Sequence, residues 1–279
     1  MPTAVDPINL LSMNQILSLA AGTLPEFSPH EVADAAGSAG FSHVGFTIEP
    51  DKWNAPALRA TQSAIAAHDL SVLDVEVIWI PEGGAVGDDH RVIIEAGAEL
   101  GAPNILAVSA EPDKDRTAAA LRQLCEWAAP ANMRVSLEFL MITAVQSLGD
   151  ALDIVQRCDH EAASILVDTL HFCRAGHEPA DLAAVNPELF AYSQICDGSA
   201  ECAPEFDAYL EDAVDLRSAP GEGKLPAGNI IAALPENIPL SLEVRSRGYR
   251  DAYPDAADRS RAIRQQVEKF FSAKNVSLR

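Results

Sequence analysis

Four polar side chains each follow an apolar run in this 279-residue chain, from its middle onward. They are Glu138 in VSLEFL, Asp168 in ILVDTLH, Gln194 in AYSQICD and Glu243 in LSLEVRS. A carboxylate among apolar residues is costly unless a positive group compensates it. Carboxylate and amide oxygens are hard ligands that suit Mn²⁺, Mg²⁺ or Co²⁺. The pattern therefore predicts that these four residues hold one divalent metal ion, with Mn²⁺ favoured.

The alternative is that each acid caps a helix or pairs with an arginine. Only Arg245 and His171 lie close by in sequence, so these strands carry no matching set of basic residues. A shared cation explains all the acids at once, and the metal site is the better hypothesis.

Short apolar runs alternate with longer Ala-rich amphipathic segments along the whole chain, which is typical of parallel strands joined by helices. The strand candidates are residues 15–22, 43–48, 72–80, 104–110, 134–140, 164–172, 189–198 and 239–246. Eight such units in this length predict an α/β fold of the (β/α)8 TIM-barrel type, as a single domain over residues 1–279. In a barrel the four polar residues would share the carboxyl-terminal face, where active sites lie.

Several segments carry helix-start signals. The helix candidates are residues 28–40, 54–69, 113–129, 147–159 and 255–274. In the first of them, Ser28, Pro29 and Glu31 form a capping-box pattern. The stretch 197–226, between the seventh and eighth strands, is predicted to be one long irregular loop over the barrel mouth.

Charge and hydropathy narrow the classes of partner. The chain has 20 basic and 41 acidic residues, a net charge of −21, which disfavours nucleic acid. No apolar run approaches the ~20 residues that span a bilayer, and the start of the chain lacks a basic leader, so we expect no membrane contact. The five cysteines form no C-x-x-C pair, which is typical of reduced thiols and a cytoplasmic protein.

Between about residues 130 and 250, the segments SLEFL, LVDTLHF, YSQICDG, PGEGKLP and SLEVRS resemble the sugar phosphate isomerase/epimerase family, the xylose isomerase-like barrels. This group includes ketose 3-epimerases, hydroxypyruvate isomerase, inosose dehydratase and 3-dehydroshikimate dehydratase. The resemblance implies the same four metal ligands and a substrate-contacting or proton-transferring role for His171, in D-x-x-H. Gln194 stands where ketose epimerases use histidine, and is closer to the dehydratase branch.

Further residues are candidates for contacting the substrate. They are Arg245, on the strand face of Glu243; Arg217 and Lys224, which flank P-G-E-G and would bind an acidic group; and Glu222, an acid or base close to the metal. Asp197, Glu76 and Trp79 follow or end predicted strands and are candidates to line the pocket, although Trp79 is better explained as core packing.

These residues predict a metal-dependent isomerase or epimerase that acts on a small polyhydroxy ketone or sugar (phosphate) through an enediolate. Glu138 or Glu243 would take the α-proton, and the opposing glutamate would return one. If a β-hydroxyl is present, His171 would act as the acid and the enzyme would be a dehydratase.

A non-catalytic metal-binding barrel or partner subunit stays open as an alternative, and so does a homo-oligomer. Apurinic endonucleases, whose multi-zinc sites need several histidines, are disfavoured by the histidine placement and the acidic charge.

Overall fold

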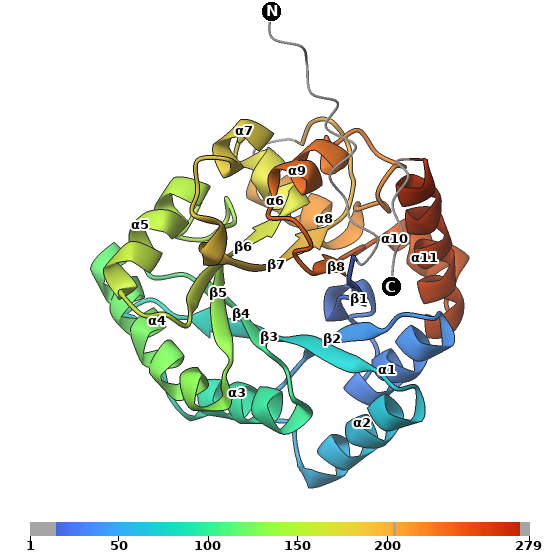
Figure 1. The fold of residues 1–279 in the computed structure, drawn as a ribbon, viewed down its shortest axis with the longest axis horizontal. Coiled ribbons are helices and arrows are strands. Elements are labelled where there is room, and N and C mark those ends of the chain that lie inside the picture. The colour runs from blue at the N-terminus through green and yellow to red at the C-terminus, as the bar shows by residue number, and fades with distance from the viewer. Residues whose placement is uncertain (1–14, 203–204, 274–279) are drawn as a thin grey trace, which may run out of the picture.

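The computed structural model describes residues 15–202 and 205–273, and these residues form a closed parallel barrel with strand order β1 to β8 (Figure 1). The strands are β1 (Leu17–Leu19), β2 (His43–Thr47), β3 (Ser71–Ile80), β4 (Asn104–Ser109), β5 (Arg134–Glu138), β6 (Ala163–Asp168), β7 (Phe190–Ile195) and β8 (Leu240–Leu242). All eight lie within the predicted segments or within one residue of them, so the predicted (β/α)8 barrel is confirmed.

Helices surround the barrel on its outside (Figure 1). The α-helices are α1 (Pro29–Ser38), α2 (Ala55–Ala67), α3 (Asp88–Leu100), α4 (Lys114–Ala128), α5 (Leu148–Cys158), α6 (Thr169–Arg174), α7 (Pro179–Leu182), α8 (Phe206–Asp215), α9 (Ala227–Ala233), α10 (Arg247–Ala252) and α11 (Ala256–Ser272). Short 3-10 turns are η1 (Ala21–Thr23), η2 (Ala129–Ala131) and η3 (Pro187–Leu189).

The strands are apolar because both of their faces are covered, one by the helices and one by the barrel interior. Every residue of β4 and β6 is buried. Register then aligns the strand ends, since Glu138 pairs with Leu166 and Asp168 pairs with Gln194. Asp168 and Gln194 are thereby level with each other, and Glu138 lies two residues lower along β6 at the same end of the barrel.

Local side-chain bonds fix where the helices begin. The predicted capping box is present at α1, where the Ser28 hydroxyl and backbone N–H both bond to Glu31. Asn54 accepts a hydrogen bond from the Ala57 N–H at α2, and Ser147 accepts one from the Asp150 N–H at α5. These caps satisfy N–H groups that the helix cannot bond itself.

Two expectations from the sequence were wrong. The stretch 197–226 is not irregular throughout, because it contains α8, whose Tyr209 and Ala213 are buried on one face. Trp79 is not a core residue: its side chain is 50% exposed, while Ile78 and Ile80 on either side are buried. Alternation along β3 turns Trp79 away from the core.

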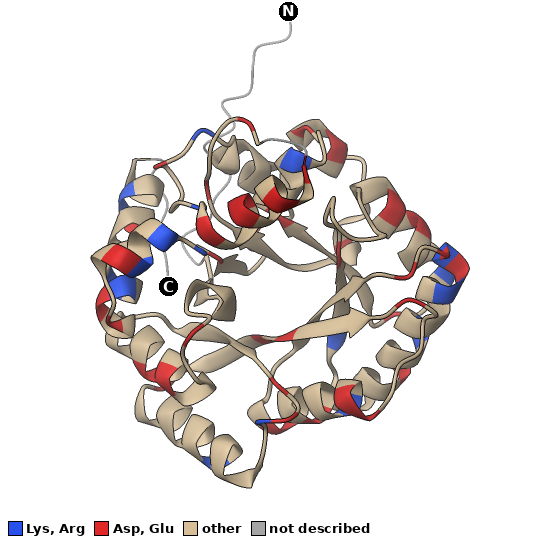
Figure 2. Cartoon of the chain, turned by 180° about the vertical axis from the view of Figure 1, so that it is seen from behind, with Lys and Arg blue, Asp and Glu red and all other residues tan. Residues whose placement is uncertain are grey.

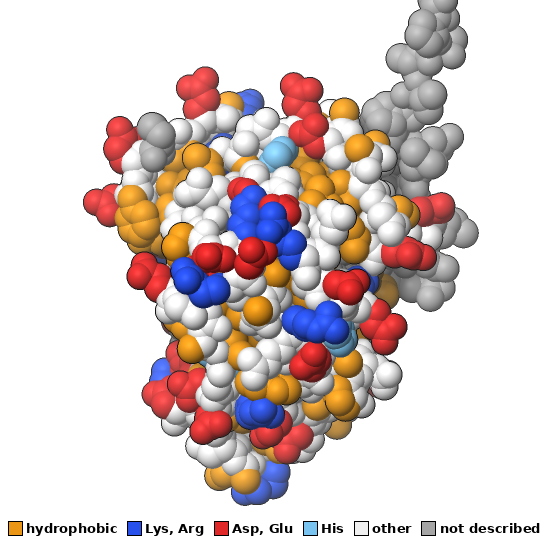
Figure 3. All heavy atoms as spheres, turned by 90° about the vertical axis from the view of Figure 1, so that its left-hand side faces the viewer, with side chains coloured by type: hydrophobic (Ala, Val, Ile, Leu, Met, Phe, Trp, Pro, Cys, Tyr) orange, Lys and Arg blue, Asp and Glu red, His pale blue; other side chains and the backbone are white. Residues whose placement is uncertain are grey.

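Acidic side chains are spread over the helices and loops, and acids also lie on the barrel strands (Figure 2). On the face over α4 and α5, basic groups lie beside acidic ones (Figure 3). There Arg157 contacts Asp153 and Asp115, and Lys114 contacts Asp150. No helix within the described residues is both long and apolar enough to span a membrane.

Candidate metal and substrate site

The four predicted metal ligands all reach the carboxyl-terminal end of the barrel. Glu138 and Asp168 are the last residues of β5 and β6, Gln194 lies near the end of β7, and Glu243 directly follows β8. Each is buried, with exposed fractions of 5%, 0%, 1% and 8% in that order. The barrel therefore brings three carboxyl groups and one amide into a single buried region.

Asp168 organises the β6 end of this region. Its Oδ1 accepts hydrogen bonds from the backbone N–H groups of Leu170 (2.7 Å) and His171 (3.1 Å), so Asp168 is the N-cap of α6. The cap turns the chain directly from strand into helix and holds His171, which is 3% exposed, beside the site. The D-x-x-H spacing is therefore a strand-to-helix turn.

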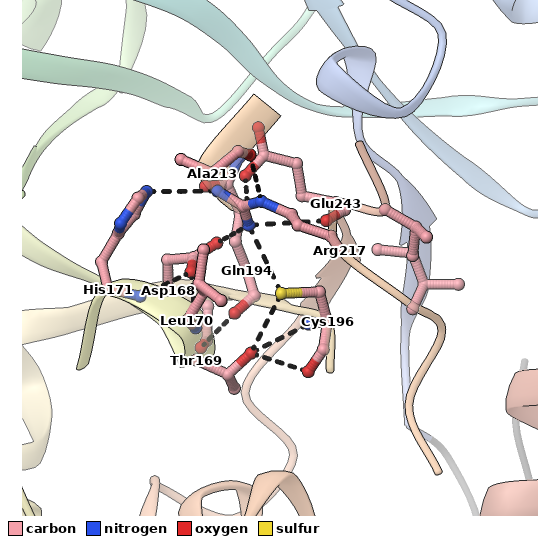
Figure 4. Close-up of polar contacts among 12 residues, drawn as sticks. Asp168, Thr169, Leu170, His171, Gln194, Cys196, Ala213, Arg217 and Glu243 are labelled. Atoms are coloured by element: carbon pink, nitrogen blue, oxygen red, sulfur yellow. Dashed lines mark hydrogen bonds and ion pairs between the residues drawn. The ribbon is translucent and has the colours of Figure 1, made fainter. Parts of the chain in front are cut away.

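Arg217 lies at the centre of the site (Figure 4). Its Nη1 is 2.6 Å from Asp168 Oδ2 and 3.0 Å from Glu243 Oε2. Its Nη2 is 3.1 Å from His171 Nε2, and its Nε donates to the Ala213 carbonyl at 2.7 Å. The strands carry no matching set of basic residues, as predicted, but the chain after α8 supplies this arginine from outside them.

The pKa values reflect burial and this arginine. Burial alone would raise the pKa of Asp168, but the charge and hydrogen bond of Arg217 bring it below its usual range. Burial and the repulsion of Asp168 and Glu243 raise the pKa of Glu138 well above normal. Burial also raises the pKa of Glu243 to about 7, against the opposing effect of Arg217. The site therefore contains carboxyl groups of very different acidity.

His171 has its tautomer fixed by its neighbours. The Arg217 guanidinium can only donate, so His171 Nε2 must accept its hydrogen bond and the ring proton lies on Nδ1. Nδ1 is 2.6 Å from the Tyr209 hydroxyl, which also accepts from the Met141 N–H at 3.3 Å. Burial lowers the pKa of His171 to about 4, so the ring is neutral at pH 7. The Tyr209 oxygen accepts two bonds, which leaves its own proton available to donate.

Two of the predicted metal ligands carry buried oxygens that lack hydrogen-bond partners. Glu138 Oε1 and Gln194 Oε1 are buried and have no hydrogen-bond partner among the described residues. The Gln194 amide NH₂ lies 3.4 Å from Glu76 Oε2, which accounts for the amide's nitrogen end. Glu138, Asp168 and His171 each offer one ligand atom within 4.8 Å of the others. Buried oxygens without partners are unusual in native proteins and fit a bound cation.

The other candidate residues lie at different distances from this centre. Burial raises the pKa of Glu76 and of Glu243, and the charge of the half-buried Arg245 opposes both increases. Glu76 is buried at the end of the site and accepts from the Thr47 hydroxyl at 3.1 Å. Its position agrees with a residue that lines the pocket.

Three candidates in the chain between β7 and β8, Asp197, Glu222 and Lys224, have no contact with the four predicted metal ligands among the hydrogen bonds and ion pairs of the described residues. Glu222 is exposed and accepts a hydrogen bond from the Tyr249 hydroxyl at 2.9 Å. Lys224 is also exposed. The Asp197 carboxylate binds the N–H groups of Gly221 and Leu225, so it shapes this loop. Contacts of Glu222 and Lys224 with a substrate stay a prediction.

Two site residues were missed from the sequence. Tyr209 belongs to α8, and the apolar spacing of that helix was the signal that could have found it. Gly22 lies in η1 against Glu243, and a Cβ there would collide with Glu243 Oε1. A lone glycine gives no sequence signal for such a contact.

Comparison with known proteins identifies the family of this chain. The family model described as the xylose isomerase-like TIM barrel matches residues 33–270. The chain belongs to this family. A 3-dehydroshikimate dehydratase of Pseudomonas aeruginosa is 28% identical over 155 residues, which are 53% of this chain and 24% of that protein. The chain thus matches about a quarter of the length of that relative.

Solved structures of the xylose isomerase-like family share the fold. An IolI protein with a bound zinc atom has a TM-score of 0.76 at 16% identity, over 92% of this chain and 98% of that one. A D-allulose 3-epimerase from Methylomonas, in complex with D-allulose, has a TM-score of 0.68 at 12% identity, over 93% and 98% of the two chains. At these identities the likeness concerns the fold.

Proposed function

We propose that this protein is a divalent-metal-dependent isomerase or epimerase of a small polyhydroxy ketone or sugar. The observation that carries the proposal is that Glu138 from β5 and Glu243 after β8 both lie beside Asp168. Glu138 and Asp168 offer ligand atoms within 4.8 Å of each other, and Glu243 shares the Arg217 guanidinium with Asp168. Two acid-base groups that reach one centre from separated strands are what proton removal and return require. The D-allulose 3-epimerase fold neighbour is consistent with this reaction class.

Glu138, Asp168, Gln194 and Glu243 would hold the metal, whose chemistry is that of a Lewis acid which polarises a substrate carbonyl. One glutamate takes the proton next to that carbonyl, and the other returns a proton to the opposite face or to the next carbon. Burial excludes water from the site. It therefore strengthens the interaction of the substrate carbonyl with the metal and with the glutamates.

Arg217 and Tyr209 stabilise the negative charge that develops on the substrate oxygen. Nε of Arg217 donates to the Ala213 carbonyl, and Nη1 donates to Asp168, with longer contacts to Cys196 Sγ and the Glu243 carbonyl. Nη2 donates to His171, so its second N–H is left for a substrate oxygen. The Tyr209 hydroxyl offers a second donor from the His171 side. Hydrogen-bond donors that are already oriented in a site without water stabilise such a charge most effectively.

Dehydration is the second candidate, and two observations favour it. Gln194 stands at the third ligand position, and the Pseudomonas relative is a 3-dehydroshikimate dehydratase. The acid for the departing hydroxyl would then be Tyr209, with His171 behind it, because both ring nitrogens of His171 are engaged. The first half of the reaction, removal of the α-proton, is the same.

The test is incubation with Mn²⁺ in D₂O with a panel of ketoses, including D-allulose and D-fructose, and separately with 3-dehydroshikimate. Deuterium at the carbon next to the carbonyl together with an epimer or aldose supports the proposal. Loss of water from 3-dehydroshikimate, followed by ultraviolet absorbance, supports the second candidate. Mn²⁺ binding without exchange in any substrate would favour the non-catalytic barrel.

A further inference from the structure

A cavity of about 570 Å³ lies between the loops that lead into α1 and α2, at the carboxyl-terminal end of the barrel. One wall is residues 25–31, which run into the first turn of α1, and the other comes from residues 47–61, which run from the end of β2 into α2. The two helices pack side by side (Figure 1). Pockets for small molecules have volumes of about 300–1,000 Å³. We call this cavity the α1–α2 pocket.

Most of the wall of the α1–α2 pocket is apolar. Phe27 and Trp53 contribute one aromatic side chain from each wall, and both side chains are half-buried. The other apolar lining residues are small: Pro25, Pro29, Pro56, Ala57 and Ala60. Aromatic side chains that remain partly exposed around a concave surface are typical of a ligand site.

The carboxylates of the α1–α2 pocket already have partners within the chain. The pairs are Glu26 with Arg259, Glu49 with Lys52, and Glu31 with Ser28. The lysine of the pocket is therefore also paired. A charged ligand would find no unpaired Lys, Arg, Asp or Glu side chain among the described residues of the wall, so the pocket favours an uncharged ligand.

Both walls of the α1–α2 pocket are connected to the predicted metal site. Thr47 lines the pocket, and its hydroxyl donates a hydrogen bond to Glu76 at 3.1 Å. The other oxygen of Glu76 lies 3.4 Å from the Gln194 amide nitrogen. On the other side, Gly22 in η1 precedes the first wall segment and lies against Glu243. The pocket is therefore next to the metal site on the β1–β2 side of the barrel.

We propose that the α1–α2 pocket binds an uncharged aromatic ring, and that the substrate of the metal site is a polyhydroxy ketone that carries such a ring. The ring packs against Phe27 and Trp53, because flat apolar groups stack well on aromatic side chains. The polyol part of the same molecule reaches the carboxyl groups at the strand ends. The statement about the substrate rests on the proposed function, whereas binding of the ring alone does not.

The first test is a fluorescence titration of the metal-free full chain with 2-naphthol, an uncharged aromatic probe at pH 7. We expect Trp53→Ala, which removes one aromatic wall, and Ala57→Trp, which fills the pocket, each to weaken binding by at least about 10-fold. The matched controls are Trp127→Ala in α4, where Arg91 covers the ring, and Ala66→Trp at an exposed position of α2. Both controls should bind 2-naphthol as the unaltered chain does.

The second test measures the connection to the metal site by calorimetric titration of the Mn²⁺-loaded chain with D-fructose and with 6-O-benzyl-D-fructose. We expect the benzyl compound to bind at least about 10-fold more tightly, and Trp53→Ala to abolish this difference.

Three results would overturn the proposal: no binding of 2-naphthol, binding that neither pocket variant weakens, or equal affinity for the two fructoses. Failure of the proposed function gives a different result. In that case 2-naphthol still binds in the pocket, but neither fructose exchanges deuterium with the solvent, and the statement about the substrate is refuted together with the proposed function.

Discussion

Arg217 Nη1 lies 2.6 Å from Asp168 Oδ2, and both side chains are almost entirely buried. The same nitrogen is 3.0 Å from Glu243, so one guanidinium is shared by two of the predicted metal ligands. Because arginine does not lose its proton in proteins, this charge is permanent. The Arg217 guanidinium therefore places a permanent positive charge beside the oxygens that would hold a metal.

Replacing Arg217 should lower the stability of the fold. We expect Arg217→Met to destabilise the metal-free protein by about 3–5 kcal/mol, because it leaves buried carboxylates unpaired. Urea unfolding in EDTA measures the loss. The control is Arg261→Met, whose ion pair with Asp258 joins side chains that are 45% and 61% exposed, and this change should cost at most about 1 kcal/mol. Equal losses in the two variants would contradict a central role for Arg217.

His171 should make the folded state less stable in acid. Burial lowers its pKa to about 4, while in the unfolded chain it is close to 6.5. As pH falls below 6.5 the unfolded state takes up this proton first, so the contribution of His171 to stability is intact above pH 6.5 and falls by about 3 kcal/mol by about pH 4. The raised pKa values of Glu138 and Glu243 act in the opposite direction, because these groups take up protons first in the folded state. Urea unfolding of the metal-free protein and of His171→Gln between pH 7 and 4 isolates the contribution of His171 as the difference between the two curves. We expect the unaltered protein to lose stability relative to the variant as pH falls, and parallel curves would refute the assignment.

Tyr209 should matter for turnover more than for binding. Tyr209→Phe removes the free hydroxyl proton beside His171, and we expect kcat to fall about 10²-fold or more with KM little changed. Steady-state kinetics on the substrate found by exchange measures this. Tyr253→Phe, at a 40% exposed tyrosine, is the control and should retain full activity. If both variants keep wild-type kcat, Tyr209 is not a proton donor.

Gly22 should tolerate no side chain. In Gly22→Ala the new methyl collides with Glu243, and we expect a loss of about 1–3 kcal/mol in stability together with lower Mn²⁺ affinity. Denaturant unfolding and metal titration measure the two effects. Gly149→Ala in α5 meets only Ser147 Oγ at 3.8 Å and should be neutral or slightly stabilising. Wild-type metal affinity in the Gly22 variant would show that Glu243 does not need this space.

The barrel could be predicted from the sequence because each strand can be recognised from a short stretch of neighbouring residues. Each is a short apolar run between helix caps, and parallel order makes the polar residues at the strand ends neighbours. Glu138, Asp168, Gln194 and Glu243 came together for this reason. Their role as metal ligands still rests on chemistry and stays a prediction.

Arg217 was predicted to bind an acidic group of the substrate, but its pairing with Asp168 and Glu243 could not be predicted, because it depends on tertiary contacts. Its position follows from α8 and from bridges that pair Leu216 with Ser246 and Asp197 with Ser218. The residues around P-G-E-G do not indicate where this part of the chain runs in the fold. The apolar spacing of α8 was present in the sequence, but the stretch was interpreted as a loop, so Tyr209 was not recognised as a site residue.

Binding of Mn²⁺, followed by electron paramagnetic resonance of the free ion, tests the central claim most directly. We expect one site per chain in the unaltered protein, at least about 10-fold weaker binding in Glu138→Gln and in Gln194→Leu, and no change in the exposed control Glu95→Gln. Equal Mn²⁺ affinity in all four proteins, or no binding in any, would contradict a metal held by these strand-end residues.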